Sequence, residues 1–191
     1  MPQIVSGIWG KVGTDDILGG AITKAKLAYP AGLESLLKEY TSKDSLFVLY
    51  SSSYHSAGPL LYNFKGTISR VELILGKDGS PTGTGYFRII RWSDKAILRE
   101  ITLDVSTLST TETWVSFELS NPLPIDSPTD VAIVFYYSGG DGSNYVEAFS
   151  YASDVDANVA HVAQLSDDSW HVYSDHDSPF KIYRTFYGPT V

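Results

Sequence analysis

The stretch TWVSFEL, Thr113–Leu119, decides the fold, because apolar and polar residues alternate along it. A period of two places successive side chains on opposite faces of a β-strand. Val115, Phe117 and Leu119 are therefore predicted to face a core. The stretch predicts a strand with one buried face.

Similar patterns recur on both sides of this stretch. The run VAIVFYY, Val131–Tyr137, is continuously apolar or aromatic, which is typical of a strand buried on both faces. Val71, Leu73 and Leu75 stand at alternate positions, as in a strand with one buried face. Three prolines in the segment 122–128 predict a break between strands, because proline donates no backbone hydrogen bond. Turn signals separate about eight to ten such strands between residues 46 and 190.

The segment before these strands has a different spacing. In LESLLKEY, residues 33–40, apolar side chains stand at positions 33, 36, 37 and 40, which predicts one short helix. We expect an all-β fold, an antiparallel β-sandwich or jelly roll of about 8–10 strands with a short N-terminal arm and one small helix. The expected domains are 1–45, an attachment arm containing the helix, and 46–191, the sandwich.

Composition excludes several classes of site. The 191 residues include no cysteine, which excludes disulfides, thiolate metal sites and a cysteine nucleophile. The longest apolar run is too short to span a bilayer, so no membrane insertion is expected, and no secretory signal is visible. A net charge of −8 argues against nucleic acid as a partner. No Lys or Arg occurs between Arg99 and Lys181, so this acidic stretch is either a solvated face or a source of ion ligands.

Two parts of the sequence resemble known viral and extracellular modules. The first spans residues 64–151 and is carried by KGTISRVEL (65–73), GSPTG (79–83), LST (108–110), WVSF (114–117), VAIV (131–134) and GDGSNY (140–145). It resembles a β-sandwich module of phage and archaeal-virus surface proteins and of bacterial extracellular proteins, similar in topology to carbohydrate-binding jelly rolls. The second, GAITKAKLA (20–28), resembles a short repeat of viral tail fibres and spikes.

This resemblance implies a non-enzymatic virion structural protein, such as a capsid-vertex, turret, spike or tail-fibre component. Its expected partners are its own copies, as a trimer or pentamer, and other virion proteins, and its expected location is the virion surface or otherwise extracellular. The N-terminal arm would mediate assembly through its apolar side chains, which are Ile22, Leu27, Leu33, Leu36, Leu37 and Tyr40.

The alternative function is a carbohydrate-binding module that attaches to host or extracellular glycans. Aromatic rings stack on the apolar faces of sugars, and four aromatic residues stand at strand ends or beside loops: Trp92, Tyr145, Trp170 and Tyr173. Packing in the core or at a subunit interface also explains these residues, and it is the favoured interpretation.

We expect no cofactor other than structural calcium, which is the better of two candidate metals because loop oxygens suit a hard cation. The candidate ligands are Asp141, Ser143 and Asn144 in one loop and Asp154 and Asp156 in another, although the same residues are strong turn formers. A cluster at residues 171–177, with two His and two Asp, suits a transition metal or a polar loop. Nothing selects a pair of catalytic carboxylates, and no Gly-x-Ser-x-Gly motif occurs, so we expect no enzyme activity.

Overall fold

The structure, a computed structural model, describes residues 33–186, which form ten β-strands, a 3₁₀ turn and no α-helix. Residues Glu34–Thr185 form one compact unit. The strands are β1 (Leu33–Tyr40), β2 (Ser45–Leu49), β3 (Tyr54–Asp78), β4 (Thr84–Arg91), β5 (Ala96–Asp104), β6 (Thr113–Tyr136), β7 (Tyr145–Ser150), β8 (Val159–Leu165), β9 (Trp170–Tyr173) and β10 (Phe180–Phe186), and the turn η3 covers Val105–Thr107.

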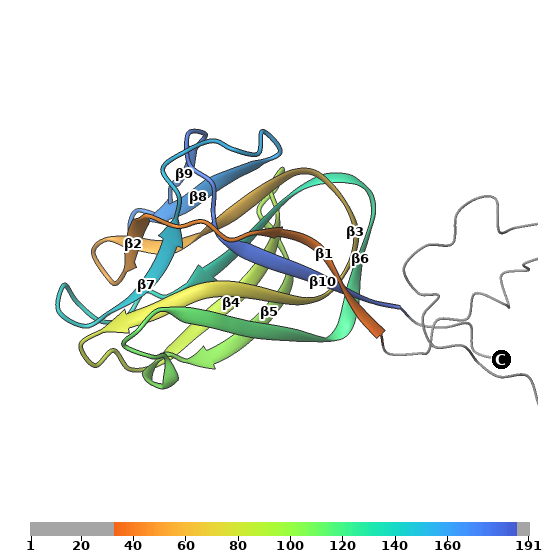
Figure 1. Ribbon diagram of the computed structural model, residues 1–191. Helices are drawn as coiled ribbons and strands as arrows, with labels where there is room; N and C mark the ends of the chain where they lie inside the picture. The colour runs from red at the N-terminus through yellow and green to blue at the C-terminus, as the bar shows by residue number, and fades with distance from the viewer. Residues whose placement is uncertain (1–32, 187–191) are drawn as a thin grey trace, which may run out of the picture. The chain divides into compact units, whose positions relative to one another are not determined.

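Two long strands, β3 and β6, belong to both sheets of a β-sandwich (Figure 1). Residues 54–61 of β3 pair with the end of β6, and this first sheet has the order β5–β4–β6–β3–β8–β9. Residues 66–78 of β3 pair with the beginning of β6 and also with β10 and β7. This second sheet continues to β1 and β2, and the extended ladders are antiparallel in both sheets.

The bend in β3 joins the two sheets. Its register against β6 shifts three times between Leu61 and Arg70. Shifts of this kind are β-bulges, which bend a strand and increase its twist. Asn63 lies in the bend with a φ of 51°, and its backbone N–H donates to the Asp130 carboxylate at 2.9 Å. The bend therefore lets one strand contribute to both layers.

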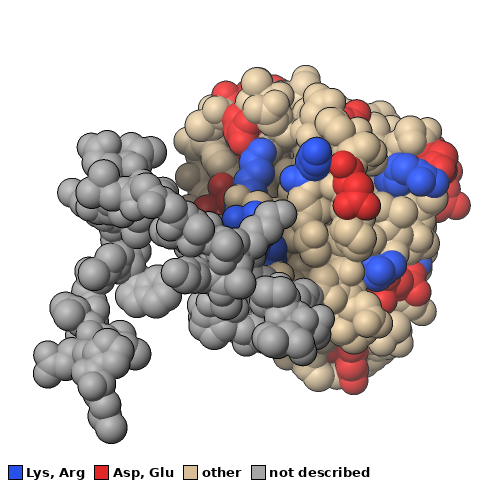
Figure 2. Space-filling view, turned by 90° about the vertical axis from the view of Figure 1, so that its right-hand side faces the viewer, with Lys and Arg blue, Asp and Glu red and all other residues tan. Residues whose placement is uncertain are grey.

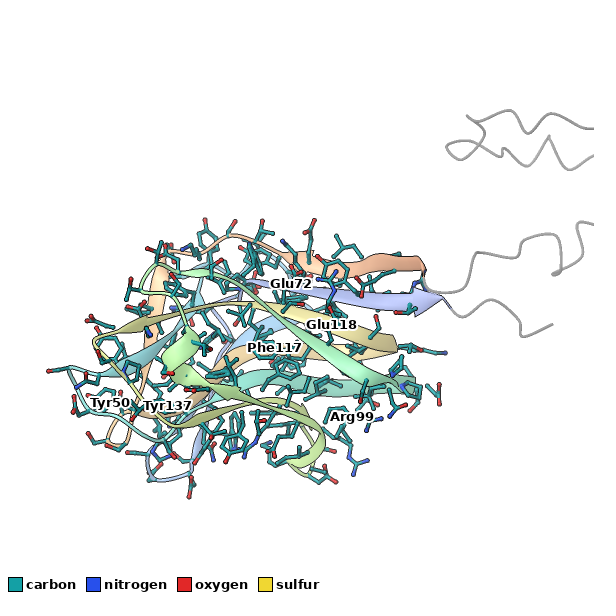
Figure 3. The ribbon with its side chains drawn as sticks, turned by 90° about the horizontal axis from the view of Figure 1, so that it is seen from below. Tyr50, Glu72, Arg99, Phe117, Glu118 and Tyr137 are labelled. Carbon is teal, nitrogen blue, oxygen red and sulfur yellow. The ribbon has the colours of Figure 1, made fainter. Side chains whose placement is uncertain are left out.

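The main core lies between the two sheets. Phe87 of β4 stacks on Phe117 of β6 with ring centroids 4.4 Å apart and planes at 11°. Figure 3 shows Phe117 in the interior. Gly58 allows a close backbone approach between β3 and β6, because a Cβ there would lie 2.1 Å from the carbonyl oxygen of Ile133.

The alternating strands are confirmed. Phe117 and Leu119 are buried, and Val115 packs against the main core. The run Val131–Phe135 is completely buried, as predicted for a strand covered on both faces. The apolar residues at 71, 73 and 75 also belong to the main core. Period-two alternation therefore located the core side of these strands correctly.

The predicted break at residues 122–128 is wrong. β6 runs through Pro122, Pro124 and Pro128, and Pro124 lies opposite Thr67 of β3. Within residues 33–186, the ladder on the other side of β6 starts only at Val131, where β4 begins to pair with it. The prolines thus lie where β6 has a strand on one side, which is the position in a sheet that tolerates proline.

The predicted helix at 33–40 is also wrong, because these residues form strand β1. β1 pairs with β10 at the edge of the second sheet. Leu37 and Tyr40 pack against the main core, whereas Leu36 is 44% exposed. Pairing and burial outweigh the helical spacing here. Since the compact unit starts at Glu34, β1 belongs to the sandwich rather than to a separate arm.

The chain enters and leaves the compact unit at the same end. β1 and β10 are neighbours, and the beginning of β1 lies beside the end of β10 at the right of Figure 1. Tyr50 and Tyr137 lie at the opposite end (Figure 3). That opposite end is formed by loops, with Ser51 N–H donating to the carbonyl of Gly139 at 3.1 Å.

Candidate functional site

A second apolar cluster lies on the outer face of the first sheet. In β6, Ala132 and Val134 belong to it, whereas Val131 and Ile133 belong to the main core. Neighbouring side chains on a strand point to opposite faces, so this outer cluster lies outside the sandwich. Its six residues are at most 4% exposed, and they are Leu60, Ile90, Ala132, Val134, Ala160 and Val162.

Three aromatic side chains, Tyr62, Trp92 and Trp170, pack against the outer cluster and are half-buried; we call them the tryptophan cluster. Trp92 follows β4 and Trp170 begins β9. Their ring centroids lie 5.5 Å apart with the planes at 85°, an edge-to-face contact that aromatic rings favour. The fold therefore brings together two of the four residues predicted to bind glycans.

Lys95 lies over the tryptophan cluster. Its Nζ is 3.4 Å from the centroid of the Trp92 ring and donates to the Trp92 carbonyl at 2.5 Å. Burial lowers the pKa of Lys95, while the nearby Asp94 acts in the opposite direction. An ammonium group held on a ring face is a cation–π contact.

Unusual backbone angles accompany each member of this cluster. Among residues 33–186, three residues other than glycine have positive φ: Asn63 (51°), Lys95 (60°) and Asp168 (64°). Each lies within three positions of an aromatic residue of the tryptophan cluster. Such angles cost free energy outside glycine and often occur at functional sites. Tyr62 and Lys95 were missed in the sequence because Tyr62 lies within a strand and Lys95 in a turn, and neither belongs to a binding motif.

The two predicted tyrosines lie elsewhere. Tyr173 contacts the main core, with its ring 5.2 Å from Phe47 and its hydroxyl 3.3 Å from that of Tyr54. Burial raises the pKa of Tyr173 to about 12, with a further contribution from the Tyr54 hydroxyl. Tyr145 donates to the Asp78 carboxylate at 2.8 Å. The contacts of both tyrosines are those of structural side chains.

The first predicted calcium loop uses its side chains for turn hydrogen bonds. Asp141 Oδ1 accepts from the backbone N–H of Ser143 at 2.8 Å and from the Asn144 side chain at 3.1 Å. Asn144 Oδ1 accepts in turn from the backbone N–H of Ser80 at 2.9 Å. These hydrogen bonds lower the pKa of Asp141. These contacts are those of an ordinary turn, which was the alternative to calcium binding at this loop.

In the second predicted calcium loop, Asp156 pairs with Lys38 at 3.1 Å and accepts a hydrogen bond from the backbone of Asn158 at 2.9 Å. Asp154 is exposed. Within the described range 33–186, no group of three or more His, Asp and Glu side chains is arranged to hold a metal ion. Calcium binding stays a prediction from the sequence.

The cluster at residues 171–177 divides between surface and interior. His171 and Asp175 are exposed, whereas Asp177 is completely buried. Asp177 Oδ2 accepts from the backbone N–H groups of Val155 and Asp156 at 3.0 and 3.1 Å, and Oδ1 has no hydrogen-bond partner among the described residues. Burial raises the pKa of Asp177. Asp177 thus anchors the 154–156 loop.

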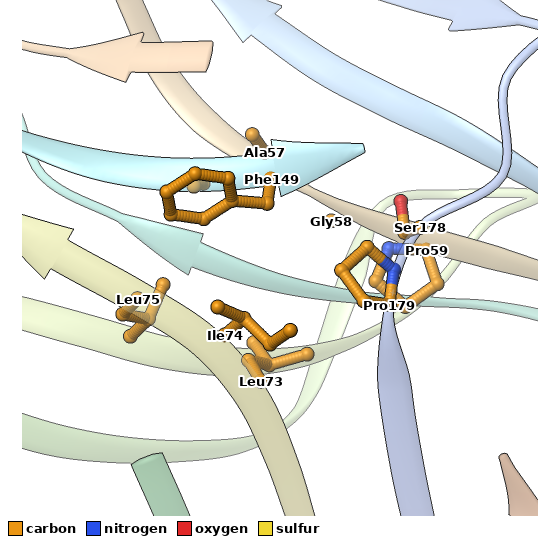
Figure 4. A pocket seen from close by; sticks show the side chains of 10 residues that line it. Ala57, Gly58, Pro59, Leu73, Ile74, Leu75, Phe149, Ser178 and Pro179 are labelled. Carbon is orange, nitrogen blue, oxygen red and sulfur yellow. The ribbon is translucent and has the colours of Figure 1, made fainter. Parts of the chain in front are cut away.

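A buried Ser–His pair fixes the segment before β10. His161 Nδ1 lies 2.6 Å from Ser178 Oγ, and both residues are completely buried. Such a pair is part of many nucleophilic sites. Ser178 also lines a crevice between β3, β7 and this segment (Figure 4), but its volume of about 10 Å³ holds only one water molecule. The pair is buried, with no room for a substrate.

A larger hollow of about 290 Å³ lies beside β2 and is lined by Lys43, Leu46, Glu112 and Phe149 among others. Lys43 pairs with Glu112, and its Nζ lies 4.6 Å from the Phe149 ring. Burial raises the pKa of the neighbouring Glu147. Two of the charged side chains that line the hollow, Lys43 and Glu112, therefore pair with each other.

Of the residues predicted to mediate assembly, Ile22 and Leu27 lie outside the described residues. Leu33 begins β1, Leu36 is exposed, and Leu37 and Tyr40 pack on their own sandwich. Only Leu36 is therefore placed, among the described side chains, where a second copy could contact it.

An ion-pair network ties β1 to the rest of the second sheet. Arg70 of β3 donates to Glu34 of β1 through Nε at 2.9 Å and also contacts Glu72 and Glu118. Its guanidinium lies 3.5 Å from the Tyr183 ring. On the face shown in Figure 2, Lys and Arg side chains lie among Asp and Glu side chains rather than in one basic patch. Residues 33–186 contain no helix that is long and apolar enough to cross a membrane.

Comparison with known proteins assigns no family. No protein-family model matches the sequence, and no curated protein matches it significantly. Among solved structures, a chain from the structure of Triatoma virus matches with 11% sequence identity and a TM-score of 0.28, covering 98% of this chain and 80% of that one. This is a weak structural similarity, and a TM-score at this level carries no argument about shared architecture or role.

Proposed function

We propose that this protein is a non-enzymatic component of a virion surface that self-assembles through residues preceding β1 and displays the β-sandwich. The supporting observation is that β1 and β10 are neighbours, with both chain ends of the compact unit at one end of it. If the sandwich is attached at this end, the loops at the opposite end and the outer faces of both sheets stay exposed. The sequence resemblance of residues 20–28 and 64–151 to viral surface modules supports a virion as the location.

Mass in solution tests the assembly. Light scattering after size exclusion is measured for the full chain and for a chain that starts at Leu33, which keeps β1 and hence the compact unit. We expect a trimer or pentamer for the full chain and a monomer for the shorter one, with circular dichroism confirming that both are folded. Equal masses for the two chains would contradict assembly through the preceding residues.

We propose glycan binding as a second function, supported by the convergence of Trp92 and Trp170 on the outer face of the first sheet. Half-buried indole rings offer the flat apolar surface on which sugars stack. A glycan array with the full chain and with Trp170→Ala tests this function. Trp114→Ala is the matched control, because Trp114 lies in the second sheet beneath Lys181. We expect glycan binding by the full chain that Trp170→Ala abolishes and Trp114→Ala retains; equal loss in both variants would contradict the proposal.

A further inference from the structure

The face of the Trp92 ring already carries a positively charged group. The Lys95 ammonium lies 3.4 Å from the ring centroid, at the distance of a close cation–π contact. It interacts with the negative face of the ring, which is also the surface that attracts the C–H groups of a sugar. The ammonium and a stacked sugar would therefore compete for the same face of the Trp92 ring.

Holding Lys95 in this place has a cost. Its φ of 60° lies in the left-handed region, which disfavours side chains other than Gly, Asn and Asp. Burial lowers the pKa of this ammonium, while Lys95 as a whole is exposed. The gain is one cation–π contact and one hydrogen bond to the Trp92 carbonyl. The ammonium is held on the ring by these two contacts alone, so a ligand that makes more contacts with the ring can replace it.

Apart from Lys95 itself, the charges around the tryptophan cluster disfavour an acidic ligand. On β4, Arg88 is paired with Glu100 at 2.8 Å, and Arg91 is paired with Asp94 at 2.7 Å. Asp130 lies close enough to Tyr62 for its charge to add to burial in raising the pKa of the Tyr62 hydroxyl. Once Lys95 moves away, both of these arginines remain paired and the negative charge of Asp130 remains.

We infer that the tryptophan cluster binds a neutral saccharide, and that Lys95 covers the Trp92 ring until the saccharide displaces it. This inference rests on the proposed glycan-binding function and adds the ligand class and the residue that controls access. Lys95 is the specificity-determining residue because it competes with the sugar on the ring face, whereas Arg88 and Arg91 of β4 are already paired.

The test compares the full chain with Lys95→Asn, since asparagine tolerates positive φ and lacks the ammonium. Lys65→Asn is the matched control, because Lys65 is an exposed lysine of β3. The probe is an array of neutral glycans, each printed beside its sialylated form. We expect Lys95→Asn to bind the same neutral glycans about two- to fivefold more tightly, as removal of one cation–π competitor implies, while Lys65→Asn binds like the unmodified chain.

The outcomes separate the two levels of the proposal. If neither the unmodified chain nor Lys95→Asn binds any glycan, glycan binding itself is overturned. If the unmodified chain binds and Trp170→Ala does not, but Lys95→Asn binds no more tightly than the unmodified chain, displacement of Lys95 is overturned while glycan binding stands. Stronger binding to the sialylated forms would overturn the neutral ligand class.

Discussion

Acid is predicted to destabilise the sandwich through His161. The imidazole is completely buried, with its ring centroid 4.0 Å from that of Phe47. Nδ1 contacts Ser178, and Nε2 has no hydrogen-bond partner among residues 33–186. Burial, with a smaller contribution from His176, lowers the pKa of His161 from 6.5 to about 3. The folded protein thus keeps the ring neutral at a pH where the unfolded chain binds a proton.

The sign and size follow from this difference. Because the folded pKa is lowered, stability is unaffected above pH 6.5 and falls as the pH decreases from 6.5 towards 3. Each pH unit in this window lowers the free energy of unfolding by about 1.4 kcal/mol, so His161 accounts for a loss of about 2 kcal/mol at pH 5. Asp177 acts in the opposite direction, because its raised pKa lets the folded protein take up a proton first and gain stability as the pH falls.

Urea unfolding of the full chain at pH 8, 7, 6 and 5, followed by tryptophan fluorescence, measures the effect. His161→Phe removes the titrating group and keeps a ring beside Phe47, and the change in its stability with pH is compared with that of the unmodified chain. Asp177 is present in both, so its contribution cancels. His171→Gln, at an exposed histidine, is the control, and His161→Gln replaces the Phe variant if that fails to fold. An equal loss of stability between pH 8 and 5 in the unmodified chain and the His161 variant would refute the reasoning.

Three further substitutions test the fold, each by urea unfolding. Gly58→Ala places a Cβ 2.1 Å from the carbonyl oxygen of Ile133 and should lower the free energy of unfolding by about 3 kcal/mol. Gly142→Ala is its control, because a Cβ there meets nothing closer than 4.0 Å and should change stability by less than about 0.5 kcal/mol. Similar effects of the two substitutions would contradict the close approach at Gly58. Arg70→Met removes the contacts that hold β1 and should cost about 1–2 kcal/mol, less in 1 M salt, and a cost independent of salt would argue against an ion-pair origin. Phe117→Ala empties the centre of the main core and should cost about 3–5 kcal/mol; a loss below 1 kcal/mol would place Phe117 outside the core.

The sequence predicted the elements that local pattern controls. Strict alternation around Phe117 and the continuous run after Val131 identified strands, because side-chain burial in a sandwich has a period of two. Residues 33–40 were misinterpreted because a partly buried edge strand needs few apolar positions, and helical spacing satisfies them by chance. The prolines were misinterpreted because tolerance depends on whether a second strand pairs there, which sequence does not show.

The candidate site was predicted only in part. Trp92 and Trp170 were selected by residue type, but only the pairing of the first sheet shows that they meet. The same criterion selected Tyr145 and Tyr173, whose hydroxyls are bonded elsewhere. Lys95 carried no sequence signal, because its contact depends on a positive φ in the turn after β4. Convergence of residues on different hairpins is a property of topology, which local pattern does not encode.

The proposed glycan-binding face is tested most directly by the indole N–H signals of the full chain in a proton–nitrogen NMR spectrum. The chain has four tryptophans, Trp9, Trp92, Trp114 and Trp170, and single Trp→Phe variants assign their signals. On addition of the neutral glycan with the strongest array signal, the Trp92 and Trp170 signals should move together while that of Trp114 stays in place. Unchanged Trp92 and Trp170 signals, or a shift confined to Trp114, would contradict the assignment of the tryptophan cluster as the binding face.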